Sequence, residues 1–203
     1  KAVAAAYHNE GEFIADALQA GWYDLLLLLQ LADQHALKFS SANNKLTPGS
    51  VPTLLDQLLQ GDFLSPADLE TDGGRAKAGA AQGEKMGGKL KVEDTIRPFG
   101  LITFAKGAGL MTTVYGAARV TESGRALLNS QEPALLLEAF ENWTKGSAFD
   151  EITRIQAIKG FKSHGLRLTS PAMRRERIVE ALSWCPAGVW IDIATFYRGL
   201  KVW

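Results

Sequence analysis

The stretch that decides the fold class lies in the middle of the chain and reads Leu110-Met111-Thr112-Thr113-Val114-Tyr115-Gly116-Ala117-Ala118-Arg119-Val120-Thr121. Two β-prone runs flank the pair Tyr115-Gly116, and this pattern predicts a β-hairpin with a two-residue turn. Thr121 then offers a hydroxyl that can cap a helix over 124–128, and Ser123 is the alternative cap. The stretch therefore predicts a small hairpin set among helices.

The residues before the hairpin show helical periodicity. Apolar side chains recur at helical spacing over 12–31, which predicts a helix buried on most sides. A brief alternation over 36–40 predicts a short strand. A second helix is expected over 48–60, with Thr47 as its N-cap and Pro48 in its first position.

A third helix is expected over 92–106, directly before the hairpin. The predicted order is then helix, short strand, helix, insertion, helix, hairpin and helix. This is the element order of a winged helix-turn-helix, so the predicted fold class is mainly α with small β-hairpins in winged helix-turn-helix modules.

The C-terminal third repeats the first half of this order. Helices are expected over 133–144 and 149–159, and Ser170 followed by a proline predicts a helix over 171–183. The apolar residues expected to face inward on that last helix are Met173, Ile178, Val179 and Leu182.

After that helix, residues 189–191 resemble a strand, and Asp192 is placed to cap a final helix that reaches about Leu200. The chain stops where the next helix of a second winged helix should begin. We therefore expect the second module to be incomplete and the chain to be a fragment of a longer protein.

The domain organisation follows from these patterns. Residues 73–91 hold six glycines among Ala and Lys and almost no large apolar residue, which predicts a linker or insertion. The expected segments are N-terminal helices with the first half of winged helix 1 (1–72), the linker (73–91), the second half with its hairpin (92–132), and a helical segment that begins winged helix 2 (133–203).

A family resemblance rests on two short stretches. The first is Val120-Thr121-Glu122-Ser123-Gly124-Arg125-Ala126-Leu127-Leu128, and the second is Arg167-Leu168-Thr169 followed by Arg174-Arg175 and Cys185-Pro186-Ala187-Gly188-Val189-Trp190-Ile191. Both resemble winged-helix regions beside bacterial XPB-type DNA helicases, and in arrangement the resemblance covers residues 25–203. It implies a helicase-associated, DNA-binding accessory region, without helicase chemistry because the motor motifs are absent.

The charge is distributed unevenly although the formal net charge is zero. Residues 1–72 carry 10 acidic and 3 basic side chains, whereas residues 145–203 carry 5 acidic and 10 basic ones. Such asymmetry bears on partners rather than on fold. The longest apolar run is too short for a membrane span, and the single Cys185 fits a reducing compartment, so a cytoplasmic location without membrane association is expected.

The basic C-terminal segment is the strongest functional lead. Between Lys145 and Arg177 lie eight Lys or Arg side chains against three acidic ones. Arginine beside a helix N-terminus suits backbone phosphate, so this segment predicts contact with duplex or single-stranded DNA. A solvated, salt-bridged helix surface is the alternative. The candidate nucleic-acid-binding residues are Lys159, Lys162, His164, Arg167, Ser170, Arg174, Arg175 and Arg177.

The helix over 92–106 argues against base-specific reading. It occupies the recognition-helix position, but apolar residues dominate its middle, and only Arg97, Thr103 and Lys106 are polar enough to reach base edges. The apolar residues Phe99, Ile102 and Phe104 are therefore candidate partner-binding residues. They motivate the alternative hypothesis, a protein-interaction scaffold within a larger complex.

Enzymatic readings receive little support from the sequence. The segment Gly83–Leu90 nearly satisfies the phosphate-loop pattern, but Leu90 stands where a hydroxyl must hold magnesium. The three histidines lack a second ligand at metal spacing, and no nucleophile motif is present. We therefore expect no enzyme, no cofactor and no metal.

Overall fold

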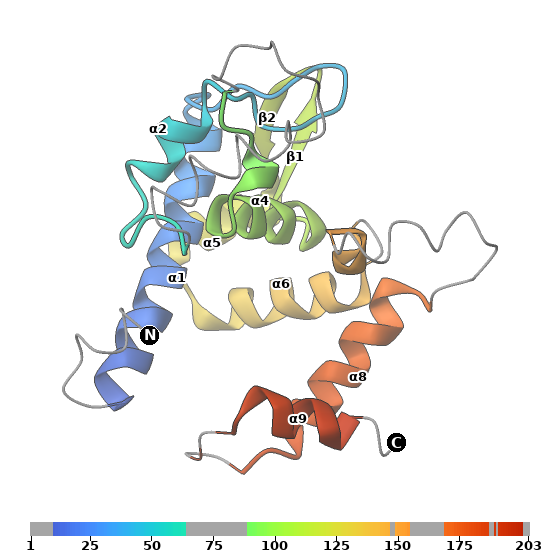
Figure 1. Cartoon of the computed structure of the whole chain (residues 1–203). Helices are drawn as coiled ribbons and strands as arrows, with labels where there is room; N and C mark the ends of the chain where they lie inside the picture. Colours follow the sequence, from blue (N-terminus) through green and yellow to red (C-terminus); the bar gives the residue numbers. More distant parts are fainter. Residues whose placement is uncertain are drawn as a thin grey trace, which may run out of the picture. The chain divides into compact units, whose positions relative to one another are not determined.

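The computed structural model describes residues 10–63, 89–146, 149–154, 169–186, 189 and 191–200, with α1 side chains from Gln19 onward. The chain forms two compact units, Lys1–Ala139 and Phe140–Trp203. The first contains α1 (Glu10–Asp33), α2 (Val51–Leu55), a 3-10 turn (Val92–Asp94), α4 (Arg97–Gly107), β1 (Met111–Val114), β2 (Ala117–Val120) and α5 (Glu122–Ser130). The second contains a 3-10 turn (Glu151–Arg154), α8 (Pro171–Ser183) and α9 (Ile193–Leu200), and α6 (Pro133–Lys145) crosses the boundary (Figure 1). The expected mainly helical class with a small hairpin is confirmed.

The core of the first unit forms around α1, which packs against α4, β2 and α5. Its inward residues Leu25, Leu28, Leu29 and Ala32 are almost completely buried. Each fully buried leucine contributes about 1.5–3 kcal/mol through the removal of apolar surface from water. Apolar burial on one long helix therefore holds this unit together.

The predicted hairpin is confirmed. β1 and β2 are antiparallel, with Met111 opposite Val120 and Val114 opposite Ala117. Tyr115 and Gly116 both have positive φ, as a two-residue hairpin turn of type I′ requires. The predicted cap is also confirmed, because the Thr121 hydroxyl accepts a hydrogen bond from the amide of Gly124 at 3.1 Å.

The strand expected over 36–40 is reduced to two isolated bridges. Lys38 pairs with Ala117 of β2, and Phe39 pairs with Leu46 across a tight turn. The amide of Phe39 donates to the carbonyl of Gly116, and a Cβ at Gly116 would come within 2.8 Å of the Phe39 carbonyl oxygen. The absence of a side chain at Gly116 thus lets this segment lie against the hairpin.

The prediction for the second helix was wrong in its start and length. α2 covers only Val51–Leu55, with Ser50 rather than Thr47 at the N-cap position. The amide of Thr47 donates to the carbonyl of Lys38, which keeps Thr47 in the paired segment. The Ser50 hydroxyl accepts hydrogen bonds from the Lys38 amide and the Thr47 hydroxyl. Pairing of Thr47 with Lys38 therefore prevents Thr47 from acting as the N-cap, and α2 begins three residues later than expected.

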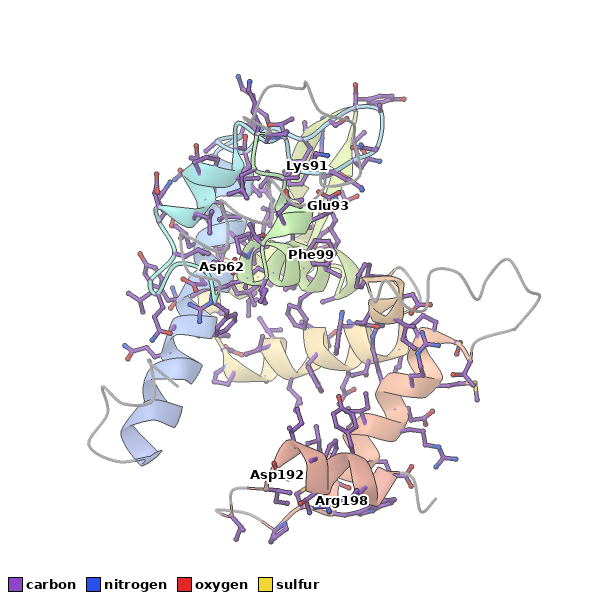
Figure 2. The ribbon with its side chains drawn as sticks, viewed as in Figure 1. Asp62, Lys91, Glu93, Phe99, Asp192 and Arg198 are labelled. Carbon is purple, nitrogen blue, oxygen red and sulfur yellow. The ribbon has the colours of Figure 1, made fainter. Side chains whose placement is uncertain are left out.

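The helix expected over 92–106 is divided into a 3-10 turn and α4. The break falls at Thr95, which is extended (φ −105°, ψ 159°). The Asp62 carboxylate accepts hydrogen bonds from the amides of Ile96 and Arg97 and so caps α4 from a distant part of the chain (Figure 2). A carboxylate is favourable at a helix N-terminus, and it fixes the start of α4 at Arg97.

In the second unit the two predicted caps are confirmed. The Ser170 hydroxyl accepts from the amide of Met173 at the start of α8, and Asp192 accepts from the amide of Thr195 at the start of α9. The helix expected over 149–159 is replaced by a 3-10 turn as far as residue 154, and residues 155–159 lie outside the described part.

The strand expected over 189–191 is absent at both of its described residues, Val189 and Ile191. Most of the predicted linker over 73–91 also lies outside the described residues. Within the part of the chain that the structure describes, no helix is both long enough and apolar enough to cross a membrane.

Candidate functional site

The structure describes half of the candidate nucleic-acid-binding residues. Ser170, Arg174, Arg175 and Arg177 belong to α8 and its cap. The other four, Lys159, Lys162, His164 and Arg167, lie outside the described residues.

Arg175 is an internal residue of the second unit. Its side chain is only 6% exposed and forms an ion pair with Glu151 at 2.7 Å. Its guanidinium donates hydrogen bonds of 2.7–2.8 Å to the carbonyls of Trp143, Gly146 and Phe149, and it stacks over the Trp143 ring at 4.4 Å. The cation satisfies backbone carbonyls at the end of α6, where the helix dipole favours positive charge. Arg175 is therefore occupied by the fold.

The neighbouring arginines also have partners within the second unit. Arg174 pairs with Asp150 at 2.6 Å, and it also donates to the carbonyl of Thr169. Arg177 is 78% exposed and pairs with Glu180 at 2.8 Å. An exposed pair such as this contributes little to stability, so Arg177 remains open to a ligand whereas Arg174 is tied down.

The candidate partner-binding residues lie on α4. Ile102 is 7% exposed and belongs to the core, and Phe99 and Phe104 are half-buried. Both cations among the candidates for base contact bind other groups of the first unit. Arg97 forms an ion pair with the fully buried Asp24 at 3.0 Å, and the Lys106 ammonium donates to the carbonyl of Asn44 at 2.7 Å. The polar side chains of α4 therefore serve contacts within the first unit, beside the apolar core along α1.

A feature that the sequence analysis did not single out is the solvent face of the hairpin. Antiparallel partners point to the same side of a sheet, and the buried partners Met111 and Val120 mark the inner side. The outer side carries Lys38, Thr112, Val114, Ala117 and Arg119, a set we call the hairpin face.

The hairpin face is positively charged. Lys38, Thr112 and Arg119 are exposed, and Tyr115 at the tip of the hairpin is 94% exposed. Neither cation is paired with an acidic side chain among the described residues. The face thus carries two positive charges and no negative one on a chain whose net charge is zero.

One signal in the sequence could have revealed this face. Lys38 stands between Leu37 and Phe39, both of which are buried. That alternation places the lysine on the outer side of an edge segment. Its proximity to Arg119 depends on a bridge to Ala117, which lies 79 positions further along the chain, and no local pattern encodes that contact.

The second unit exposes a large apolar surface. Of its described apolar residues only Ala181 is buried. The expectation that Met173, Ile178, Val179 and Leu182 face inward was wrong, because their exposed fractions are 39–57%. On α9, Ile193 and Tyr197 are likewise exposed, at 68% and 57%. α8 therefore buries Arg175, whereas these four apolar side chains are exposed.

Three titratable groups have shifted pKa values. Burial raises the pKa of Glu93, which is the largest single effect. A hydrogen bond from Lys45, a hydrogen bond from its own backbone and the charges of Lys45 and Lys91 together lower the pKa by more, so the net shift is downward (Figure 2). Burial lowers the pKa of Lys106. Hydrogen bonds from the backbone and hydroxyl of Thr195 lower the pKa of Asp192, in keeping with its role as a helix cap. Each of these pKa shifts is caused by burial or by hydrogen bonds and charges within the fold.

Nothing among the described residues gathers three or more His, Cys, Asp or Glu side chains at distances suited to a metal ion. A comparison of the chain with models of protein families, with curated proteins and with solved structures finds no match. A functional assignment therefore depends on the geometry of these surfaces.

Proposed function

We propose that the chain is a non-catalytic, winged-helix-type module that contacts the phosphate backbone of DNA with little sequence selectivity. The hairpin face is the observation that carries this proposal. Two exposed cations and a threonine hydroxyl on one side of a hairpin suit phosphate oxygens, to which such side chains donate.

The order of elements supports a winged-helix type. α1, the Lys38 segment, α2, α4, β1 and β2 follow one another along the chain, and the bridge from Lys38 to Ala117 brings the first short segment beside the hairpin. The hairpin then corresponds to the wing, and α4 to the recognition helix.

The composition of α4 favours contact with phosphate over the reading of bases. Readout in the major groove requires side chains that reach base edges. Gly100 is exposed and offers none, while Arg97 and Lys106 are held by Asp24 and Asn44. The module would therefore bind unrelated sequences with similar affinity.

The experiment is fluorescence anisotropy of labelled duplexes of unrelated sequence against the full chain across a salt series. The wild type should bind them with similar affinity and weaken steeply with salt. The double variant Lys38→Ser, Arg119→Ser removes two phosphate contacts, so the slope of log K against log salt should flatten by about 1.8. The control Arg125→Ser, Lys145→Ser removes the same charge elsewhere and should leave the slope unchanged.

Equal slopes for the hairpin variant and the wild type would contradict the proposal. Lys159, Lys162, His164 and Arg167 remain predicted contacts, and a steep slope that survives the hairpin variant would direct attention to them. No binding at low salt would instead favour the second candidate.

The second candidate is a protein-interaction scaffold, favoured by the exposed apolar surface of the second unit. Ile178 and Leu182 on α8, and Ile193 and Tyr197 on α9, form pairs one helical turn apart. Exposed charges of both signs, Arg177 and Glu180, lie on α8 beside these residues. Such a surface suits an amphipathic helix of a partner protein, because its apolar stripe repeats at the same spacing.

A further inference from the structure

The tip of the hairpin carries an aromatic side chain that the first unit does not bury. Tyr115 is 94% exposed, the highest fraction among the large apolar side chains of the described residues. No ring contact or hydrogen bond joins its side chain to the part of the chain that the structure describes. The turn lies at the outer end of the hairpin, because α4 and α5 both adjoin the other end (Figure 1).

The turn itself does not favour a tyrosine. Tyr115 has a φ of 55° or less, at 49°, in the first turn position. This left-handed conformation is unfavourable for a bulky side chain. Asn followed by Gly is the preferred pair in such a turn, and Gly116 already occupies the second position. The ring therefore stabilises neither the turn nor the core, and it is available to another molecule.

We propose that Tyr115 stacks on an unpaired base, and that the DNA bound at the hairpin face is a duplex with a single-stranded extension. The inference rests on the proposed phosphate contact and specifies the form of DNA at that same site. Aromatic side chains beside a positively charged surface bind single strands in this way, because every base has a flat aromatic face.

An intact duplex offers no free base face to this ring. Each base pair is covered by its neighbours, and a side chain that enters between two pairs must first break their stacking. That cost is comparable with what one contact between a base and an aromatic ring returns. Tyr115 therefore adds affinity where a base is already unpaired. The contact adds no sequence selectivity, because all four bases can stack.

The register of the hairpin sets the distance from the bound phosphate to the unpaired base. Arg119 lies opposite Thr112, and Tyr115 follows Thr112 by three residues. Lys38, paired with Ala117, lies between Arg119 and the tip. Three residues of strand span about 10 Å, and one DNA strand advances about 3.4 Å per nucleotide, so the unpaired base lies about three nucleotides from the phosphate at Arg119. A short extension is therefore sufficient.

Fluorescence anisotropy of the full chain with two labelled DNAs gives the first test. One is a blunt duplex, and the other is a duplex with a short single-stranded extension and the same total number of phosphates. The wild type should bind the extended duplex about 10-fold more tightly. Tyr115→Asn removes the ring but suits the turn, so it should abolish this preference without loss of thermal stability. Tyr115→Phe keeps the ring and should retain the preference.

Two controls separate stacking from charge and from the general loss of an exposed ring. Lys38→Ser combined with Arg119→Ser should weaken the binding of both DNAs and leave their ratio unchanged. Tyr197→Asn removes a tyrosine that is 57% exposed on α9, and it should leave both affinities unchanged.

A fluorescent base gives a second readout that reports stacking directly. 2-Aminopurine is placed at the unpaired positions next to the duplex, where an aromatic ring stacked on it quenches its fluorescence. The wild type and Tyr115→Phe should quench it, and Tyr115→Asn should not.

Two results would overturn the inference and leave the phosphate contact in place. One is equal affinity of the wild type for the two DNAs. The other is a Tyr115→Asn variant that keeps both the preference and the quenching. The phosphate contact is scored separately, on the salt dependence of binding to blunt duplexes. Binding to neither DNA at low salt would overturn both.

Discussion

The interiors of the two units differ in which side chains they bury. The first has an aliphatic core along α1, with Leu28 and Leu29 at 0% exposure, and it also buries the ion pair between Asp24 and Arg97. The second buries Arg175 and leaves Ile178 and Leu182 of α8 on the surface. Residue type alone therefore does not predict which side chains are buried and which remain exposed for contact with another molecule.

The difference follows from which groups each unit has to bury or to hydrogen-bond. α1 is long enough to cover several elements, so apolar burial suffices there. The end of α6 instead presents backbone carbonyls that need donors, and Arg175 supplies hydrogen bonds to three residues at once. An arginine that looks like a phosphate ligand in the sequence is thereby used as a structural connector.

The largest effect is expected from the buried pair of the first unit. Asp24→Ala leaves Arg97 without its carboxylate and the amide of Leu59 without its acceptor. Because breaking a buried ion pair is strongly destabilising, we expect a loss of about 3–5 kcal/mol in the free energy of unfolding. Denaturant unfolding measures it.

The matched control is Asp33→Ala, whose partner Arg125 lies on the surface. That variant should lose less than about 1 kcal/mol. Similar losses for the two aspartates would show that burial does not set the strength of the first unit's ion pairs.

The next largest effect is expected in the second unit alone. Arg175→Met removes the donors to three carbonyls, and each buried orphaned acceptor costs about 1–3 kcal/mol. We expect a destabilisation of about 3 kcal/mol, seen as faster hydrogen exchange in α8 while α1 is unchanged. Arg177→Met, at a position that is 78% exposed, should change exchange very little. Equal effects at both arginines would contradict the internal role of Arg175.

A small effect is expected from the apolar surface of α8. Ile178→Ser and Leu182→Ser replace side chains that are 45% and 54% exposed, so each should change stability by about 0.5 kcal/mol or less. Leu28→Ser in the first unit, at 0% exposure, should lose several times more. If thermal unfolding shows large losses at Ile178 or Leu182, these side chains are covered within the chain and the second candidate function loses its basis.

The smallest effect concerns pH. The pKa of Glu93 in the folded chain lies below its ordinary value of 4.5, so its contribution to stability is present above that value and is lost as the pH falls through the folded pKa. Lys45→Met removes the hydrogen-bonding partner and should raise the pKa of Glu93, as followed by NMR titration of its carboxyl carbon. Lys38→Met removes a charge without that hydrogen bond, and a comparable rise there would contradict the assigned cause.

Local signals in the sequence predicted most of the local structure. The turn at Tyr115-Gly116 and the caps at Thr121, Ser170 and Asp192 each depend on a few neighbouring residues, and all four are confirmed. The start of α4 was missed because its cap, Asp62, lies 35 positions before Arg97.

The candidate surfaces were harder to predict for the same physical reason. Arg175 is buried by carbonyls 26 to 32 positions away, and Lys38 reaches the hairpin through a bridge to Ala117. A helical wheel places Arg175 and Leu182 on the same side of α8, because they are seven residues apart, but it does not show that Arg175 is buried and Leu182 is exposed. Contacts between distant segments decide such outcomes.

The most direct test compares the two units in one DNA titration. Lys38→Ser with Arg119→Ser removes two charges from the hairpin face, and Arg174→Gln with Arg177→Gln removes two from α8. We expect the first pair to flatten the salt dependence by about 1.8 and the second pair to leave it nearly unchanged. A flattened slope for the α8 pair together with a wild-type slope for the hairpin pair would contradict the assignment of phosphate contact to the first unit.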